Sequence, residues 1–166
     1  MISQARPALA SAASLQFNIL TLAAAVTAAI AATTAASIGW PVWAMFMGWV
    51  AFFTRGHTAK EALSSYLCLA SGIAFGTVAA SGVAALIPLM GPLAFGPVVF
   101  GVAIIVVSLR AMPHLNNVSS YFLGLITFFA AHLEPGIAAF CELAAVSGLG
   151  SFAAWLSHKF QSRIMR

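Results

Sequence analysis

The chain has 166 residues, of which 62% are hydrophobic and 6% are charged, and its mean hydropathy is +1.02. A soluble domain carries about 25% charged residues, so this composition excludes a soluble globule and predicts an all-α integral membrane protein. The net charge of +4 would suggest nucleic-acid binding in a soluble protein. In a membrane protein, basic residues instead mark the cytoplasmic side. We therefore expect the lipid bilayer as a partner, and no nucleic acid.

Six apolar segments follow one another along the chain, each bounded by a turn or by charged residues. They are expected at about 15–38, 41–54, 61–86, 93–112, 118–131 and 137–158. Residues 88–92 are an expected turn, and Asn116-Asn117 is the expected turn and helix cap before the fifth segment. A helix that spans a bilayer needs about 20 apolar residues, so the second and fifth segments are short. Residues 1–14 resemble the start of a signal peptide, but the apolar stretch that follows is long enough to span the bilayer. We interpret 1–14 and 159–166 as tails of one membrane domain, residues 1–166.

The seven Lys and Arg residues are distributed unevenly between the two sides of these segments. With a cytoplasmic N-terminus, all of them fall in the two tails or in the loops at 55–60 and 110–117. The loops on the other side hold none. Cytoplasmic loops carry an excess of Lys and Arg, so this pattern predicts six crossings of the cell inner membrane with both termini in the cytoplasm.

One pattern occurs twice in the chain. Residues 46–53 and 122–129 both read Phe-x-Gly-x-x-x-Phe-Phe, 76 residues apart, and the same offset places Ser71-Gly72 on Ser147-Gly148. Each copy of this repeat would contain three crossings. Because three is an odd number, the second copy must enter the membrane from the side opposite to the first. We therefore predict six transmembrane helices as a 3+3 inverted repeat, with copies at about 15–86 and 92–158.

The repeated segments are the candidate solute site. In transporters built from inverted repeats, short interrupted helices at matching positions indicate a site near the membrane midplane. Glycine allows close approach to the backbone, and two sets of Phe rings would make a narrow, weakly polar constriction. The alternative is that these are ordinary packing residues of membrane helices. The predicted pore residues are Phe46, Gly48, Trp49, Phe52, Phe53, Phe122, Gly124, Thr127, Phe128, Phe129 and Glu142.

Three ionisable residues complete the candidate site. Glu142 lies within the sixth segment, where it could contact a solute, relay a proton or form a structural hydrogen bond. His132 and Glu134 lie in an outer loop and could act in gating or proton sensing, since histidine titrates near pH 6.5; a merely solvated pair is the alternative. No nucleophile–base pair, phosphate loop or metal-ligand cluster is present, so we expect no enzyme, no cofactor and no metal site.

Residues 40–53 resemble the signature segment of a family of small bacterial inner-membrane proteins of the YcdZ type, and residues 121–129 resemble its second such segment. The resemblance covers residues 15–160. The family has no known function, so the resemblance implies a multi-span inner-membrane protein and no substrate.

Three functions fit these observations. The first is a channel or facilitator for a small neutral or weakly acidic solute, with a pore at the interface of the two repeats and a homo-oligomeric assembly. The second is proton- or ion-coupled transport, with Glu142 and His132 titrating. The third is an accessory protein without transport activity, which would be favoured if Gly48 and Gly124 were buried in tight helix contacts with no cavity beside them.

Overall fold

The computed structural model describes residues 5–165, and side chains from residue 15 onward. No strand occurs in this part of the chain, so the predicted all-α class is confirmed. The predicted tail residues 1–4 and 166, and the side chain of Arg6, lie outside the described residues. The elements are α1 (Ala5–Ser37), α2 (Val42–Phe53), α3 (Ala59–Met90), η1 (Gly91–Ala94), α4 (Phe95–Ser108), η2 (Leu109–Ala111), α5 (Val118–Ala131) and α6 (Ile137–Ile164).

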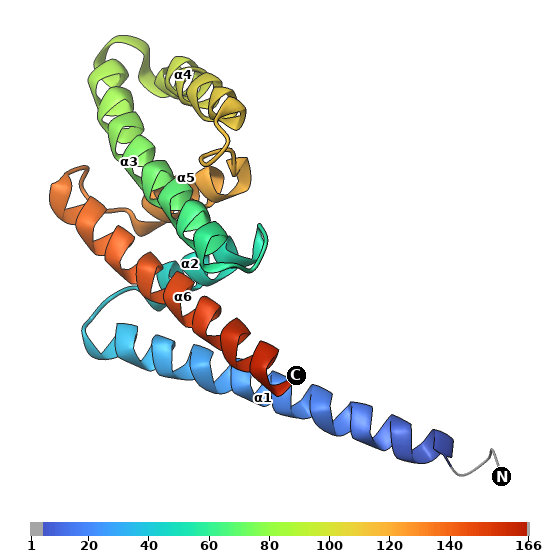
Figure 1. Cartoon of the computed structure of the whole chain (residues 1–166). Coiled ribbons are helices and arrows are strands. Elements are labelled where there is room, and N and C mark those ends of the chain that lie inside the picture. Colours follow the sequence, from blue (N-terminus) through green and yellow to red (C-terminus); the bar gives the residue numbers. More distant parts are fainter. Residues whose placement is uncertain (1–4, 166) are drawn as a thin grey trace.

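Three helical stretches are long and apolar enough to cross a membrane: Leu15–Ser37, Ala59–Ala111 and Ile137–Ile164. The middle stretch contains α3 and α4, which fold into a hairpin (Figure 1). The reversal occurs at Gly91, whose φ of 56° is a conformation that other residues rarely adopt. The helices α2 and α5 have 12 and 14 residues. At 1.5 Å per residue they are roughly 18 and 21 Å long, shorter than a hydrocarbon core of about 30 Å.

Helix α5 has the bounds expected from the sequence, whereas three other helices run further than expected. Helix α1 begins at Ala5, so residues 5–14 of the predicted tail are helical. Helix α3 continues through Pro88 to Met90, although we expected a turn from residue 88. A proline in the last turn of a helix removes only one backbone hydrogen bond there, so the helix can continue for a few residues. Helix α6 extends to Ile164, because the basic tail is also a good helix-forming sequence.

Two helix starts are fixed by side-chain caps. Thr58 and Glu61 form a reciprocal capping box at the start of α3. Asn117 Oδ1 accepts a hydrogen bond from the backbone N–H of Ser120 at 3.3 Å, which confirms the cap expected before α5.

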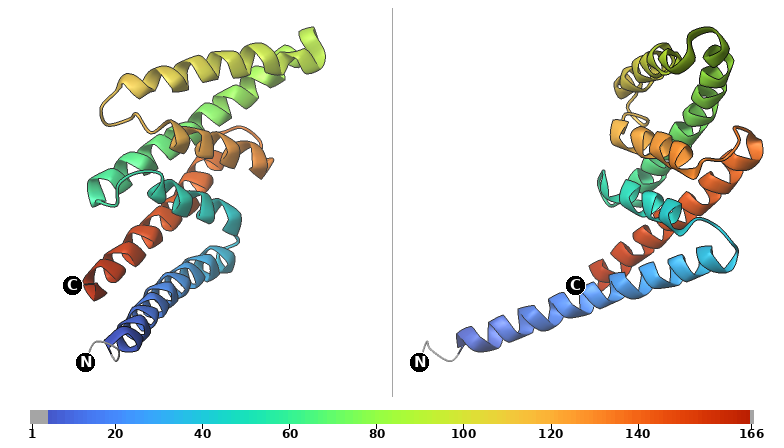
Figure 2. Two further views of the ribbon diagram at one scale, coloured as in Figure 1. Left: turned by 90° about the vertical axis from the view of Figure 1, so that its right-hand side faces the viewer. Right: turned by 180° about the vertical axis from the view of Figure 1, so that it is seen from behind.

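The two short helices each pack against the long helix of the other half of the chain. Helix α2 packs on α6, and α5 packs on α3 (Figures 1 and 2). Helix α1 lies along α6, while α4 folds back along α3. The long helices α3 and α6 also contact one another. The third helix of each half is therefore packed between elements of both halves.

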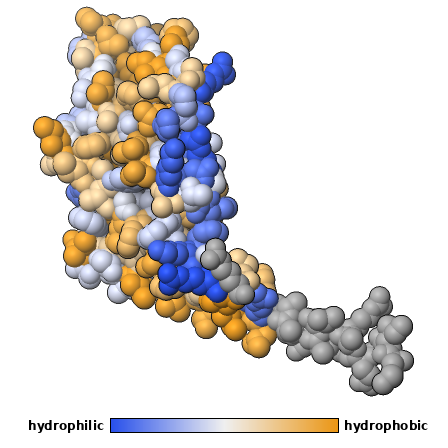
Figure 3. Space-filling view, viewed as in Figure 1, coloured by the Kyte–Doolittle hydropathy of each residue, from blue (hydrophilic) through white to orange (hydrophobic). Residues whose placement is uncertain are grey.

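Hydrophilic residues gather along one edge of the molecule (Figure 3). This edge carries the α2–α3 loop (residues 54–58), the α4–α5 connection (residues 112–117) and the C-terminal end of α6. We call it the hydrophilic edge. The α1–α2, α3–α4 and α5–α6 connections lie away from it (Figure 1).

Candidate functional site

The first predicted glycine, Gly48, lies where α2 crosses α6. A methyl group added to Gly48 would overlap the backbone carbonyl of Ser147, and one added to Gly150 would overlap the carbonyl of Met45. Two hydroxyl groups of α6 strengthen this crossing. Ser147 Oγ donates to the Ala44 carbonyl at 3.1 Å, and Ser151 Oγ donates to the Gly48 carbonyl at 2.8 Å. The face of α2 that carries Gly48 is therefore occupied by the α6 backbone.

The second predicted glycine, Gly124, lies where α5 crosses α3. A methyl group added to Gly124 would overlap the Leu69 carbonyl, and one added to Gly72 would overlap the carbonyl of Tyr121. Gly76 meets the side chain of Phe128 one turn further along. The GxxxG pattern of α3 thus allows close helix packing within the chain.

The two crossings use corresponding positions. Gly48 and Gly124 are 76 residues apart, as are Met45 and Tyr121, which contact the opposing glycines. In the long helices the corresponding contacts are Leu69 with Ser147 and Gly72 with Gly150, which are 78 residues apart. The expected match of Gly72 with Gly148 at an offset of 76 is therefore wrong. The first residues of α3 and α6 are also 78 apart, because α5 has 14 residues and α2 has 12, while the connections at 54–58 and 132–136 are equally long.

The two Phe residues that end each repeated segment point to different environments. Phe52 and Phe128 lie one turn beyond the glycines on the same face, and both are buried, with relative exposures of 0% and 2%. The other predicted Phe residues are between 40% and 46% exposed; they are Phe46, Phe53, Phe122 and Phe129. Each short helix thus has one face packed in the protein and one that the protein leaves uncovered.

A small apolar hollow of about 170 Å³ lies between α3, α4 and α5. Two predicted pore residues, Phe122 and Phe129, line it from α5, and Phe95 lines it from α4. Helix α4 contacts α3 beside the hollow, where a methyl group added to Gly82 would lie 3.5 Å from the side chain of Val98. This is the place where the structure brings predicted pore residues together around space.

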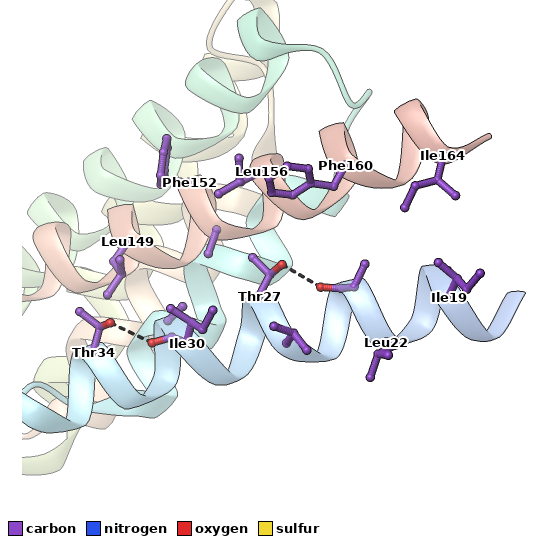
Figure 4. Close-up of a pocket in the computed structure, with 14 residues that line it drawn as sticks. Ile19, Leu22, Thr27, Ile30, Thr34, Leu149, Phe152, Leu156, Phe160 and Ile164 are labelled. Atoms are coloured by element: carbon purple, nitrogen blue, oxygen red, sulfur yellow. Dashed lines mark hydrogen bonds between the residues drawn. The ribbon is translucent and has the colours of Figure 1, made fainter. Parts of the chain in front are cut away.

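A larger groove of about 590 Å³ runs between α1 and α6 (Figure 4). Its walls include Ile30 from α1 and Phe152 and Phe160 from α6. The hydroxyl groups of Thr27 and Thr34 donate to carbonyls of their own helix, at 2.7 and 2.8 Å, so they add no free polar group. The groove holds none of the predicted pore residues.

A hydrogen-bond network centred on Asn117 was not predicted from the sequence beyond its capping role. The Asn117 amide Nδ2 donates to Thr54 Oγ1 at 2.7 Å and to Ser65 Oγ at 2.9 Å. Thr54 Oγ1 also lies 3.1 Å from Ser120 Oγ. Asn117, Ser65 and Ser120 are buried, and the network joins the end of α2 to the starts of α3 and α5.

Two histidines meet at the hydrophilic edge. The rings of His57 and His158 stack with centroids 4.6 Å apart and an interplanar angle of 27°. Phe52 packs against both rings, at centroid distances of 5.6 and 6.0 Å. The two residues are 101 positions apart, and nothing in the sequence predicts that they touch.

The remaining predicted pore residues do not line the hollow between α3, α4 and α5. Glu142 is half-buried on α6, and Trp49 is half-buried on α2. Thr127 is buried, and its hydroxyl donates to the Leu123 carbonyl of the preceding turn at 2.7 Å.

The predicted gating residues lie in the α5–α6 connection. His132 and Glu134 are both exposed there. His132 ends α5 in a left-handed conformation with φ of 52°. Their proposed role in gating stays a prediction.

Comparison with known proteins gives one match. Residues 21–161 match the family described as "Protein of unknown function (DUF1097)". No curated protein and no solved structure shows significant similarity to the chain. Within the described residues, no group of three His, Cys, Asp or Glu side chains could hold a metal ion.

Proposed function

Because the chain belongs to the DUF1097 family, whose function is unknown, we propose its function from its geometry. We propose a multi-pass protein of the cell inner membrane that acts as a channel or facilitator for a small neutral or weakly acidic solute. One observation carries this proposal. The hollow between α3, α4 and α5 is lined by Phe122 and Phe129, two residues of the repeated segment.

The proposed topology has six crossings with both termini in the cytoplasm. It is supported by the hydrophilic edge, which carries the α2–α3 loop, the α4–α5 connection and the end of α6 (Figure 3). Those segments hold or adjoin the basic residues from Arg55 onward, whereas the connections away from that edge hold no Lys or Arg. Cytoplasmic segments of membrane proteins show this bias. The proposal assigns α2 and α5 as short crossings.

The proposed architecture is a 3+3 inverted repeat of α1–α3 and α4–α6. Its support is the exchange of partners between the halves, because α2 packs on α6 in the same way as α5 packs on α3. Each contact places a glycine of the short helix on a backbone carbonyl of the long helix. A two-fold axis in the membrane plane would relate the two contacts.

The proposed path runs along α5 through the hollow, and not along the glycine faces. The hollow has no charged residue in its walls, so an ion that entered it would lose its hydration without replacement. A water molecule occupies about 30 Å³ of liquid, so 170 Å³ has room for about five waters or one solute of similar size to urea. Urea-, amide- and polyol-like solutes fit this volume.

We further propose a homo-oligomer. The short helices leave apolar faces uncovered, with Phe46, Val50 and Phe53 on α2 and Ile126 on α5 all more than 40% exposed. A helix of 12 or 14 residues is shorter than the bilayer core, so a lipid-exposed position would require the bilayer to thin. A second copy against these faces removes that mismatch.

The test is solute flux into proteoliposomes, followed by stopped-flow light scattering with urea, acetamide, glycerol and formate. Ala103 lines the hollow, whereas its neighbour Ile104 is 51% exposed outside it. We expect Ala103→Phe to fill the hollow and to reduce a selective flux about tenfold or more. Ile104→Phe, the matched control on the same helix, should leave the flux unchanged.

Wild-type flux equal to that of empty liposomes for every solute would refute the facilitator. Flux that appears only with a proton gradient would indicate coupled transport, and Glu142→Gln would then be the next variant. The second candidate function is an accessory protein that binds another membrane protein. It is favoured by the burial of Gly48 and Gly124 against backbone atoms of α6 and α3. A complete absence of flux from folded protein would support it.

A further inference from the structure

A polar pocket of about 370 Å³ opens on the hydrophilic edge, away from the proposed solute path. Three segments form it: the α2–α3 loop, the first turns of α3 and the connection before α5. Its walls are Arg55, Thr58, Lys60, Glu61, Ser64, Pro113 and His114. Neither the repeat nor the proposed facilitator accounts for this combination of residues.

Arg55, one of the two basic residues of this pocket, is held by a neutral partner. Arg55 Nη1 donates to Ser64 Oγ at 3.3 Å, and Ser64 Oγ in turn donates to the backbone carbonyl of His114. This chain of bonds orients the guanidinium group while leaving most of its five N–H donors unused. Lys60 also lines the pocket, and it is exposed.

The single carboxylate in the pocket is already bonded within the α3 cap. Glu61 Oε2 accepts from the Thr58 backbone N–H at 3.4 Å and from the Thr58 hydroxyl at 2.9 Å. Among the hydrogen bonds of the described residues, none joins Glu61 to Arg55 or Lys60. The walls therefore carry a net charge of about +1 with His114 neutral, and the basic groups face open space.

We propose that this pocket binds a phosphate group. A guanidinium fork matches the oxygens of phosphate, a lysine adds a point charge, and the ring of His114 can add a hydrogen-bond donor. If the hydrophilic edge lies at the cytoplasmic membrane surface, the pocket is at the depth of lipid headgroups. Basic pockets between membrane helices at that depth bind anionic phospholipids. The phosphate can come from such a lipid or from a free phosphate compound.

The experiment is native mass spectrometry of the full chain in neutral detergent, titrated with phosphatidylglycerol, phosphatidylethanolamine or inorganic phosphate. We expect one saturable phosphatidylglycerol site that is about tenfold weaker in Arg55→Gln/Lys60→Gln. Lys159→Gln/Arg163→Gln removes the same charge at the end of α6 and should change the affinity by less than about twofold. Lys60→Gln alone alters only an exposed side chain, so it tests the site without risk to the fold.

The choice of ligand distinguishes the two sources of the phosphate. Binding of phosphatidylglycerol without binding of inorganic phosphate assigns the site to a lipid headgroup. Saturable binding of inorganic phosphate, lost in Arg55→Gln/Lys60→Gln, assigns it to a free phosphate ligand. Equal losses in the two double variants, equal binding of phosphatidylethanolamine, or no saturable binding of any probe would each overturn the proposal. None of these results depends on the solute flux.

Discussion

Where α2 crosses α6, Gly48 lies against the Ser147 carbonyl, and the hydroxyl groups of Ser147 and Ser151 donate to carbonyls of α2. Where α5 crosses α3, Gly124 lies against the Leu69 carbonyl, and Leu69 and Ile73 occupy the positions that correspond to the two serines. All four of these side chains are buried. Close approach of two backbones therefore depends on the glycines, while the atoms beside the glycines differ between the crossings.

The two crossings also end differently at the hydrophilic edge. The α2–α6 crossing ends on the stacked rings of His57 and His158, which can carry charge. The α5–α3 crossing begins on the network of Asn117, which has no titratable group. The comparison teaches that the same backbone contact is compatible with titratable rings at the end of one crossing and a neutral hydrogen-bond network at the end of the other.

The largest expected effect comes from removing the shared feature. We expect Gly48→Val and Gly124→Val each to destabilise the protein by about 3 kcal/mol or more, because the overlapping atoms belong to a backbone and cannot move aside. Thermal unfolding in detergent, together with size-exclusion chromatography, measures the effect.

Gly101→Ala is the control for these variants, because the added methyl group meets nothing within 4 Å. It should leave the melting temperature unchanged or raise it slightly, since alanine favours helix over glycine. If Gly48→Val melted at the wild-type temperature, the α2–α6 contact would not have the geometry described here.

The sequence predicts the helical class, the bounds of α5 and the cap at Asn117. These features follow from local composition and helix length, which act within one segment. The two-residue change of register between the halves could not be predicted. Ser147-Gly148 matches Ser71-Gly72 at an offset of 76, whereas the helix contacts correspond at an offset of 78.

Long-range contacts of the site were also beyond the sequence. The Gly48 face could line a pore or bury against a helix with the same residues, and only the position of the α6 backbone distinguishes these outcomes. The Asn117 network joins residues 52 and 63 positions apart, and the pairing of His57 with His158 is longer still. The hydrophobic periodicity of a single helix does not indicate which distant residues it contacts.

A smaller effect should follow from breaking the neutral network of the α5–α3 crossing. We expect Asn117→Ala to destabilise the protein by about 2 kcal/mol, because it removes the α5 cap and leaves Ser65 Oγ without its donor. Asn116→Ala is a matched control, since the buried Oδ1 of Asn116 has no hydrogen-bond partner among the described residues. Its melting temperature should equal or exceed that of the wild type. The reverse order of the two variants would contradict the network.

The histidine stack should make the other crossing sensitive to pH by about 1 kcal/mol. Burial and the neighbouring His57 lower the pKa of His158 below its usual value, and a charge on both rings would place two positive charges about 4.6 Å apart. A lowered pKa in the folded state means that stability is greatest above the unfolded-state pKa of His158 and decreases as the pH falls below it. We expect the melting temperature to fall between pH 7.5 and 5.5 in the wild type. His158→Gln should reduce that fall, whereas His132→Gln, at an exposed position in the α5–α6 connection, should not. An equal fall in all three proteins would assign the pH response to other groups.

The smallest effect concerns the hydroxyl groups that distinguish the crossings. Ser151→Ala removes the donor to the Gly48 carbonyl, and hydrogen bonds between membrane helices contribute about 0.6 kcal/mol on average. The carbonyl of Gly48 also accepts within its own helix, so the loss leaves no wholly unbonded backbone group. We therefore expect a decrease of less than about 1 kcal/mol, close to that of Ser147→Ala, measured by reversible unfolding in the same detergent. A loss as large as that of Gly48→Val would mean that the serines, and not the glycines, hold α2 on α6. The apolar Leu69 and Ile73 could not then fulfil the same role on α3, and the likeness of the two crossings would be superficial.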